Sequence, residues 1–428
     1  MSILFRDVLG LFYDETGQIA LRTASVYVAE GKIAGIDQAP EGFSAQRTID
    51  GAGKLLIPGL INSHTHSYMT ILRNAADDLT FHDWLFGTIL PLEEKLTPED
   101  CYWGTQLGLM EMLSTGTTSF LDMYIFPHAA AEAVRDAGGR ATLSRALLSG
   151  PPGEELLREA EAELRRWKDE PQISFALAPH APYTCDPGYQ REVAALAKQL
   201  DVGIHTHISE SQREVTEIWS QYGKSPVTLL AENGLLTERT VAAHCVHLDH
   251  HDITTLAEYG VNVVHNPVSN LKLACGIAPV PKLRAAGVNV SLGTDGAASN
   301  NTLNLFGDLR LAALLHKGVS GDPQLITAAE GVEMATVNGA RALGLQDKIG
   351  QIAVGYDADL ALLDLGRLNM QPSTNPLAAL VYSASGHEVE LAMVHGKVLY
   401  EKGEFTTMDR ERILHEITAI CRRIGLAG

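Results

Sequence analysis

Two histidines in the first part of the chain have the spacing of a metal-binding pair. His64 and His66 lie two positions apart in PGLINSHTH, so on a β-strand both imidazoles point to the same side. Such a pair can bind one divalent ion, but alone it is weak evidence, because ordinary turns carry it too. Three more residues, His207, His244 and Asp295, each follow a separate short apolar run. The five side chains together predict a metal site.

The predicted ion points to hydrolytic chemistry. A bound divalent ion lowers the pKa of water from about 15.7 towards 7 and so supplies hydroxide at neutral pH. Glu210 stands three positions after His207 in HISE, where its carboxylate can carry a proton between water and a substrate. Taken alone, Glu210 is better explained as a solvated residue that begins the helix of ESQREVTEI. Its place beside a metal ligand favours the catalytic interpretation.

The elements that must position these residues follow the pattern of an α/β protein. Short apolar runs alternate with helical stretches roughly 20 to 40 residues apart, which is typical of parallel βα units. Eight such runs predict a TIM-like (β/α)8 barrel. One helix is expected to begin after Thr97, with Pro98 at its first position and Gly116 past its end. The predicted strands are residues 55–62, 119–124, 140–148, 173–179, 202–207, 240–246, 261–266 and 288–294.

Ionisable residues stand at the C-terminal end of nearly every predicted strand. Barrel enzymes place their chemistry on this rim, because packed side chains fill the barrel interior. The pattern therefore predicts one site that draws on many strands. The residues at these ends are His64, His66, Asp122, Arg145, His180, His207, His244, His265 and Asp295. His205 shares a strand face with His207 but lies deeper, and we expect it to pack behind the ligands rather than bind the ion.

Both ends of the chain have the texture of β-structure outside the barrel. The segment IALRTASVYVAEGKIAGIDQA near the start, and GQIAVGYDADLALLDL and VELAMVHGKVLYEKGEF near the end, alternate apolar residues between glycine-containing turns. We predict that they pair into one small β-sandwich domain. Its parts would be residues 1–57 and residues 349–428, the latter with a terminal helix, around a barrel of residues 58–348.

The composition excludes several classes of function. The 428 residues carry a formal net charge of −19, which argues against binding to nucleic acid or to an anionic membrane. Small molecules are therefore the expected ligands. The five cysteines include no CxxC pair, and no long apolar run suggests a signal peptide or a membrane span. We predict a cytoplasmic enzyme.

Several motifs resemble those of one known family. PGLINSHTH, GIHTHISES, VAAHCVHL, NPVSNLKLACGIAPV and SLGTDGAASNN look like the amidohydrolase superfamily, and more narrowly like its 5-methylthioadenosine/S-adenosylhomocysteine deaminases. The resemblance runs almost end to end and includes LTFHDWLFGTILPLEEKLTPED. It implies hydrolytic deamination of adenine nucleosides to inosine analogues and ammonia. The implied substrates are 5-methylthioadenosine, S-adenosylhomocysteine, adenosine and 5′-deoxyadenosine.

The resemblance also implies the make-up of the metal site. The ion is expected at positions that match His64, His66, His207 and Asp295, and it is usually zinc, with iron in related deaminases. Two-metal relatives carry a carboxylated lysine on the fourth barrel strand. The corresponding segment here, ISFALAPHAPY, contains His180 and no lysine, so one divalent ion is expected.

Catalysis is expected to depend on Glu210, His244 and Asp295. Adenine C6 is a weak electrophile, so proton transfers must accompany the attack of water. We predict that Asp295 takes a proton from the water, and that Glu210 carries it to ring nitrogen N1 and helps to protonate the departing ammonia. His244 is expected to donate to the developing oxyanion or to hold the hydroxide in line.

Substrate contacts are likewise implied by the resemblance. Glu93 matches an acceptor for the ribose hydroxyls, His180 a contact to purine or sugar, Trp84 an apolar wall near the 5′ substituent, and Arg145 a partner of the homocysteine carboxylate. Each also has a purely structural interpretation. Glu93 can be a surface charge on a helix, His180 a packed residue of the rim, and Trp84 a core residue. Arg145 can belong to a structural ion pair. With the residues at the reacting edge, the predicted substrate-binding set is Trp84, Glu93, Arg145, His180, Glu210 and Asp295.

The chain departs from the family at the carboxylate-binding loop. Members that handle S-adenosylhomocysteine carry a second arginine in the loop after the third strand. The loop LLSGPPGEELLREAE offers only Arg158, shifted in register and preceded by acidic residues. The departure favours 5-methylthioadenosine, adenosine or 5′-deoxyadenosine as the substrate.

Two alternative functions remain open. The same barrel can hydrolyse another amino- or chloro-heterocycle, such as guanine, cytosine or a triazine, although Glu93 and Trp84 argue against this. A non-catalytic binding or scaffold protein is the other alternative, but such proteins usually lose metal ligands, and none is missing here. The expected partner is a nucleoside, and the resemblance allows a homo-oligomer.

Overall fold

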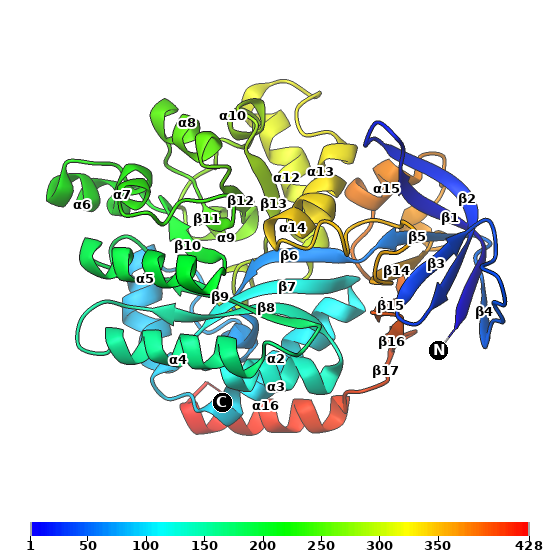
Figure 1. Cartoon of the computed structure of the whole chain (residues 1–428), viewed down its shortest axis with the longest axis horizontal. Helices are drawn as coiled ribbons and strands as arrows, with labels where there is room; N and C mark the ends of the chain where they lie inside the picture. Colours follow the sequence, from blue (N-terminus) through cyan, green and yellow to red (C-terminus); the bar gives the residue numbers. More distant parts are fainter. Residues whose placement is uncertain (1, 427–428) are drawn as a thin grey trace.

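Eight parallel strands form the barrel that the sequence predicted. The computed structural model describes residues 2–426, and in it β6 to β13 follow one another in chain order (Figure 1). The sheet nearly closes, because the N–H of Asp295, just past β13, donates to the carbonyl of His64 in β6 at 3.0 Å. The strands are β6 (Leu60–Thr65), β7 (Thr117–Tyr124), β8 (Arg140–Leu147), β9 (Ile173–Pro179), β10 (Ile204–Ile208), β11 (Thr240–His244), β12 (Asn262–His265) and β13 (Asn289–Leu292).

Helices cover the outside of the barrel between successive strands, as the βα pattern requires (Figure 1). Between β6 and β7 the chain also makes three short helical segments: η1 (Ser67–Leu72), the π-helix η2 (Asp83–Ile89) and α1 (Leu90–Glu93). The remaining helices of the barrel are α2 (Pro98–Ser114), α3 (Pro127–Ala137), α4 (Gly153–Arg166), α5 (Pro187–Leu200), α6 (Gln212–Tyr222), α7 (Pro226–Glu232), α8 (His250–Glu258), α9 (Pro267–Lys272), α10 (Val280–Ala285), α11 (Ala297–Asn300), α12 (Leu305–Ser320), α13 (Ala328–Ala335) and α14 (Val337–Ala342).

The helix α2 begins and ends where its sequence predicts. The Thr97 hydroxyl accepts the N–H of Asp100, and the Asp100 carboxylate accepts the N–H of Thr97, so two free helix donors are satisfied reciprocally. Pro98 occupies the first helical position, where the missing N–H costs nothing. Gly116 follows the helix with a φ of +80°, a conformation that glycine adopts without strain.

A second sheet combines strands from both ends of the chain, as predicted. In Figure 1 the blue N-terminal strands lie beside the orange C-terminal ones. Strand β5 joins the two groups, because it runs parallel to β1 and antiparallel to β14. The nine-stranded mixed sheet consists of β1 (Ile3–Tyr13), β2 (Ile19–Ala29), β3 (Lys32–Ile36), β4 (Arg47–Asp50), β5 (Lys54–Pro58), β14 (Leu360–Asp364), β15 (Val389–Val394), β16 (Lys397–Glu401) and β17 (Glu404–Phe405).

Both groups of strands share one apolar core, which includes Phe5 and Val26 from the N-terminal part and Leu360 and Met393 from the C-terminal part. Three further helical segments accompany the C-terminal part: η3 (Leu368–Met370), α15 (Pro376–Tyr382) and α16 (Arg410–Ile424), of which α16 packs against α2. The domain boundaries expected from the sequence stay a prediction.

The prediction of one strand over residues 55–62 was wrong. The continuous apolar run is divided between β5 of the mixed sheet and β6 of the barrel, with Gly59 at the junction. The N–H of Gly59 donates to Asp359 at 2.9 Å, whereas the next N–H donates to Gly116 at 2.9 Å, so hydrogen bonding changes sheet within two residues. Hydrophobicity alone does not reveal such a change of partner, because both strands are buried.

A buried ion pair joins the barrel to the mixed sheet. Arg140, the first residue of β8, donates through Nε to Asp359 at 2.6 Å and through an η nitrogen to Asp357 at 2.8 Å. All three residues are buried, so each charge depends on the others rather than on water. This contact lies at the N-terminal ends of the barrel strands, opposite the rim that carries the predicted site.

None of the described helices combines the length and apolar character needed to cross a membrane. All five cysteines are free thiols, and four of them are buried.

The junction at Gly59 gives a first prediction. A Cβ at this position would lie 2.0 Å from Oγ1 of Thr118, so we expect Gly59→Ala to destabilise the protein by about 1–3 kcal/mol through overpacking. Gly307→Ala is the matched control, because Gly307 lies in α12 with no atom within 4 Å of an added Cβ. That change is expected to stabilise by about 0.5–1 kcal/mol. Thermal unfolding followed by circular dichroism measures both, and equal midpoints for the two variants would contradict the prediction.

Candidate metal centre and active site

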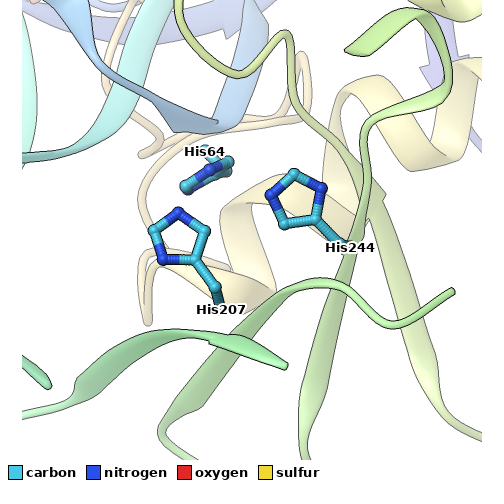
Figure 2. Close-up of side chains that lie close together, drawn as sticks. All are labelled: His64, His207 and His244. Carbon is cyan, nitrogen blue, oxygen red and sulfur yellow. The ribbon is translucent and has the colours of Figure 1, made fainter. Parts of the chain in front are cut away.

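Four imidazoles and one carboxylate converge at the C-terminal end of the barrel. His64 and His66 come from the end of β6, His207 from β10, His244 from β11, and Asp295 from the segment after β13. Oδ1 of Asp295 lies 3.3 Å from Nε2 of His64 and 3.1 Å from Nε2 of His66. The nitrogens of His64, His207 and His244 lie within 4.8 Å of one another, and Figure 2 shows the three rings turned toward a shared space. The barrel thus assembles the predicted donors.

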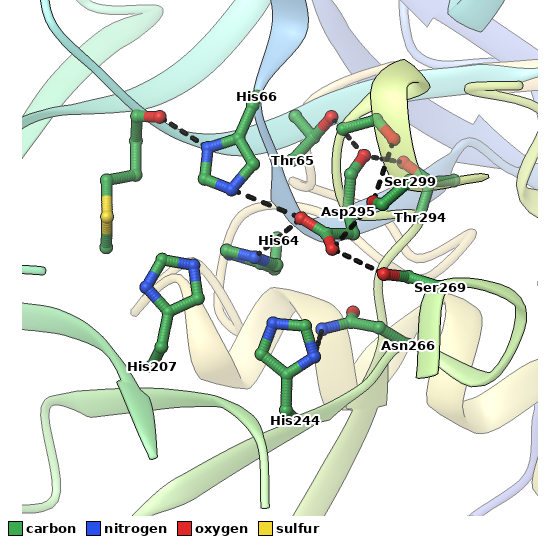
Figure 3. A network of polar contacts seen from close by, with 12 residues as sticks. His64, Thr65, His66, His207, His244, Asn266, Ser269, Thr294, Asp295 and Ser299 are labelled. Carbon is green, nitrogen blue, oxygen red and sulfur yellow. Dashed lines mark hydrogen bonds and ion pairs between the residues drawn. The ribbon is translucent and has the colours of Figure 1, made fainter. Parts of the chain in front are cut away.

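Backbone carbonyls orient two of the imidazoles. Nδ1–H of His66 donates to the carbonyl of Met123 at 2.6 Å (Figure 3), and Nδ1–H of His207 donates to the carbonyl of His180 at 2.7 Å. Because a carbonyl only accepts, the proton of each neutral ring must be on Nδ1. The lone pair is therefore on Nε2, where a metal ion can use it.

A chain of side chains orients the His64 ring in the same sense. The Ser144 hydroxyl donates to the carbonyl of Asp122 at 2.6 Å, so it accepts from Nδ1 of His205 at 3.3 Å. Nε2 of His205 then accepts from Nδ1 of His64 at 2.8 Å. Nε2 of His64 is buried and makes no hydrogen bond within residues 2–426. His205 therefore lies behind His64, at the deeper position that the sequence motif predicted.

The two oxygens of Asp295 have different partners. Oδ2 accepts the hydroxyls of Ser269 at 2.6 Å and Ser299 at 2.9 Å, and Oδ1 faces His64 and His66 (Figure 3). Burial opposes the ionised form, but the facing rings of His64 and His66 outweigh it and hold the pKa of Asp295 well below its usual value. The carboxylate is thus ionised and directs one oxygen at the imidazoles.

The cluster fits a divalent metal ion. Burial lowers the pKa of His64 to about 4 and the pKa of His207 well below its usual value, so both rings are neutral at pH 7 and can coordinate. Neutral imidazoles with one carboxylate are the ligands that zinc and similar ions accept. A divalent cation also balances the charge of the buried Asp295 and engages the unpaired Nε2 of His64.

Glu210 and His244 stand beside this cluster. Oε1 of Glu210 lies 3.6 Å from Nε2 of His244, and both residues are buried. Nδ1 of His244 lies 2.8 Å from Oδ1 of Asn270, an acceptor that places the proton on Nδ1. Burial is the main cause that raises the pKa of Glu210, and His244 partly opposes it. A carboxyl group with a raised pKa is suited to exchange protons near neutral pH.

A cavity of about 200 Å³ opens above the cluster. Its floor is polar, and its upper wall is apolar and comes largely from η2 and from the segments after β7 and β8. The lining residues are His66, Met69, Phe81, Trp84, Leu85, Phe86, Leu90, Glu93, Met123, Tyr124, Ile125, Ala146, Leu148, His180, Tyr183, Thr184, His207, Glu210, His244 and Asp295. The π-helical form of η2 matches the tendency of such turns to occur at functional sites.

Three residues predicted to contact substrate line this cavity. Glu93, at the end of α1, accepts a hydrogen bond from the hydroxyl of Tyr124, and burial raises its pKa to about 8. Trp84 is buried in η2 and donates its indole N–H to the carbonyl of Ala298 at 3.2 Å, which fixes the ring as a wall. Nδ1 of His180 lies 3.1 Å from the hydroxyl of Thr184.

Arg145 is not brought to the cavity. Its Nε donates to Glu159 of α4 at 3.1 Å, which is the ion pair weighed as its alternative role. Successive residues of a strand point to opposite faces, and the cavity is lined by Ala146 and Leu148 rather than by Arg145. Arg158 is exposed on α4 and does not line the cavity either.

Sequence reasoning missed the residues that orient the donors. Ser269 and Asn270 lie in NPVSNLK, and Ser299 lies one helical turn after Asp295, so their spacing offered a weak signal. The carbonyl of Met123 offered none, because every residue carries a carbonyl and only the strand register selects this one.

Comparison with known proteins identifies the family. A family model described as "Amidohydrolase family" matches residues 55–399. The chain belongs to the amidohydrolase family. A protein of Acetivibrio thermocellus, named 5-methylthioadenosine/S-adenosylhomocysteine deaminase, is 44% identical to this amidohydrolase over 411 residues, covering 94% of this chain and 95% of the relative. A protein of Desulforudis audaxviator with the same name is 46% identical over 408 residues, with coverage of 94% and 95%.

Solved structures agree with this grouping. An adenosine deaminase from Xanthomonas campestris with bound zinc superposes on this amidohydrolase with a TM-score of 0.94 and 36% identity over 99% of each chain. The atrazine chlorohydrolase of Arthrobacter aurescens, in complex with zinc, gives a TM-score of 0.90 and 27% identity over 98% of this chain and 99% of that one. The predicted fold class and family resemblance are confirmed, and the zinc-bound neighbours together with the donor cluster indicate a divalent metal.

The geometry predicts metal binding through Asp295. Asp295→Ala removes the carboxylate that faces His64 and His66, and we expect it to weaken zinc binding by more than about 100-fold. His251→Ala, an exposed histidine on α8, is the control and should bind zinc normally. Zinc content after dialysis, measured by mass spectrometry, tests both variants. Equal retention of zinc by Asp295→Ala and the parent protein would exclude the proposed centre.

Proposed function

We propose that this amidohydrolase deaminates adenine nucleosides, replacing the amine at C6 by oxygen and releasing ammonia. One observation carries the proposal: Glu210 and His244 lie beside the metal-binding cluster, in the same cavity that Glu93 lines. The relatives' names and that of the Xanthomonas campestris structure support the same substrate class. The acidic chain and its five free thiols also agree with the cytoplasmic location predicted from the sequence.

His64, His66, His207 and Asp295 would hold the ion, and zinc is the expected metal. The lack of lysine in β9 (ISFALAP) favours a single ion. A divalent ion supplies Lewis acidity there, which lowers the pKa of a water molecule. Because Oδ2 of Asp295 is occupied by two hydroxyls, its Oδ1 is the atom that can receive the proton of that water.

Glu210 and His244 complete the proton transfers. As the water oxygen bonds to C6, Glu210 gives a proton to ring nitrogen N1, and it then relays the proton from Asp295 to the exocyclic nitrogen. The C–N bond breaks, ammonia leaves, and the hydroxyl proton at C6 passes back to Glu210, which restores the acid and the aromatic ring in the hypoxanthine form. His244 orients the oxygen through Nε2, while Asn270 keeps the ring proton on Nδ1.

Glu93, His180 and Trp84 would bind the nucleoside. Glu93 keeps one carboxylate oxygen for the ribose hydroxyls while the other accepts from Tyr124. Trp84 presents an apolar wall, and His180 stands between this wall and the metal ligands. A free heterocycle such as guanine, cytosine or a triazine has no hydroxyl pair for Glu93 to accept.

The 5′ substituent is proposed to be neutral. No lysine or arginine of the described chain lines the cavity, and Arg145 is engaged with Glu159. Instead, Phe86, Leu90 and Leu148 line its mouth and leave 46%, 38% and 39% of their surface exposed. Covering these apolar surfaces with an apolar substituent contributes about 25 cal/mol per Å² to the free energy of binding. A methylthio or hydrogen substituent meets this requirement better than a zwitterionic homocysteine.

An assay of ammonia release tests the proposal. With added zinc, the enzyme should convert 5-methylthioadenosine, adenosine and 5′-deoxyadenosine to inosine products, with kcat/KM about tenfold or more above that for S-adenosylhomocysteine. Glu210→Gln should lower kcat by about 10²–10⁴-fold with normal zinc content, because the amide cannot shuttle the proton. Ammonia from guanine or cytosine but not from nucleosides, or chloride from a chlorotriazine, would favour another heterocycle. A Glu210→Gln enzyme with parental kcat would remove Glu210 from the mechanism.

The assignment of Glu93 predicts a pH effect. The pKa of Glu93 is raised to about 8, so its ionised form, the better acceptor, grows in as the pH rises through that value. We expect KM for 5-methylthioadenosine to fall between pH 7 and pH 9. In Glu93→Gln, which cannot ionise, KM should be higher and this dependence should be lost. Initial rates at several pH values measure the effect, and identical pH profiles for the two enzymes would deny Glu93 a ribose contact.

A further inference from the structure

The buried side chain of Glu214 binds the backbone on which Glu210 stands. Oε1 of Glu214 accepts the backbone N–H of Ser209 at 2.8 Å, and Oε2 accepts the N–H of Glu210 at 2.9 Å. Glu214 is only 2% exposed, so water does not compete for these amides. Ser209 has a φ of +51°, a left-handed conformation that residues with a side chain rarely adopt. The two hydrogen bonds from Glu214 restrain this unusual turn.

The same turn is tied on its other side to the segment after His244. The carbonyl of Ser209 accepts the N–H of Val246 at 3.1 Å and the N–H of His247 at 2.9 Å. His244 itself has a φ of +72°, so this segment too departs from ordinary strand geometry. A displacement of the Ser209 peptide would therefore move the backbone of Glu210 and loosen the backbone next to His244.

Glu210 depends on this support because its own side chain has little. Within residues 2–426 its carboxylate accepts no hydrogen bond, and it lies 3.6 Å from Nε2 of His244. The carboxylate is thus available to a substrate, whereas its direction is set by the backbone that Glu214 restrains. A group that must alternately give and take a proton needs such placement without a competing side-chain partner.

Capping of the helix α6 does not explain Glu214. The hydroxyl of Ser211 already accepts the N–H of Glu214 and serves as the N-cap. The Glu214 carboxylate instead reaches back past the helix start to the two preceding residues, which come directly after β10. An exposed glutamate in the first turn would be enough to favour the helix dipole, but this one is buried.

We propose that Glu214 is a positioning residue: by accepting the N–H groups of Ser209 and Glu210, it fixes the backbone from which Glu210 moves protons to the purine. The inference rests on the proposed function, because it takes the proton-transfer role of Glu210 as given. It adds a residue outside the cavity lining that controls the chemical step without touching substrate.

The substitution Glu214→Gln tests this role with little change in shape. The amide keeps one acceptor, but its NH₂ group faces a backbone N–H, so one buried donor loses its partner. We expect kcat for 5-methylthioadenosine to fall about 10–100-fold, with KM within about threefold of the parent and zinc content unchanged. Glu217→Gln is the matched control, because Glu217 lies on α6, is half exposed and pairs with Arg213. It should leave kcat unchanged.

A double-mutant cycle separates positioning from a structural role. If Glu214 acts through Glu210, adding Glu214→Gln to Glu210→Gln should change the residual kcat less than twofold, because the group it positions is already inactive. If the two losses multiply, Glu214 acts independently and the proposal fails. Parallel loss of kcat, rise in KM and loss of zinc in Glu214→Gln would also overturn it, since a general loosening of the site gives that pattern.

A second variant covers the case in which Glu214→Gln does not fold. Glu214→Asp keeps the carboxyl group but is too short to reach both amides, so kcat should be reduced with KM and zinc content retained; a parental kcat would contradict the proposal. The outcomes also distinguish the proposed catalytic mechanism from the positioning role of Glu214. If Glu210→Gln is fully active, the proposed mechanism fails first. If only the Glu214 variants are fully active, the positioning role fails alone.

Discussion

The whole site depends on the burial of one ionised carboxylate. Asp295 is 4% exposed, and an isolated charge at such a place costs several kcal/mol unless positive charge or donors surround it. Two hydroxyls take one of its oxygens, and the other points at the imidazoles, where a divalent cation completes the balance. The demand for a cation is therefore built into the packing of the barrel. The same burial lowers the pKa of His64 and His207, because low solvation disfavours a charge on their rings.

The parallel register of the barrel strands orients the imidazoles of this site. Each barrel strand ends beside its neighbour, so the carbonyl of Met123 in β7 meets His66, and the carbonyl of His180 after β9 meets His207. These acceptors belong to the backbone and cannot be removed by substitution of a side chain. The orientation of the His66 and His207 imidazoles is thus a property of the fold, whereas Ser144 and His205 orient His64 through side chains. The residues of the cavity wall can therefore differ while the arrangement of the imidazoles stays the same.

The sequence predicted what periodicity and residue type encode. The eight barrel strands, the boundaries of α2 and the cluster of histidines could be recognised because each has a local pattern, and the depth of His205 in the strand predicted its place behind His64. Three features could not be predicted from such patterns. The break at Gly59 is hidden in a continuous apolar run, because a change of hydrogen-bonding partner leaves no mark on hydrophobicity. Arg145 stands at the predicted rim, but the face that a strand-end residue presents depends on register. Glu214 looks like any glutamate in a first helical turn until its burial is seen.

Arg140 has a consequence for how this architecture can be rearranged. Its guanidinium is inserted between two aspartates contributed by the opposite end of the gene, more than two hundred positions later. Exchanging the flanking strands for ones that lack these acids would leave the guanidinium buried without a partner, at a penalty of about 3–5 kcal/mol. This ion pair therefore couples the barrel to its accessory sheet. Chimeras that exchange one of them between homologues must carry the guanidinium and both acids together.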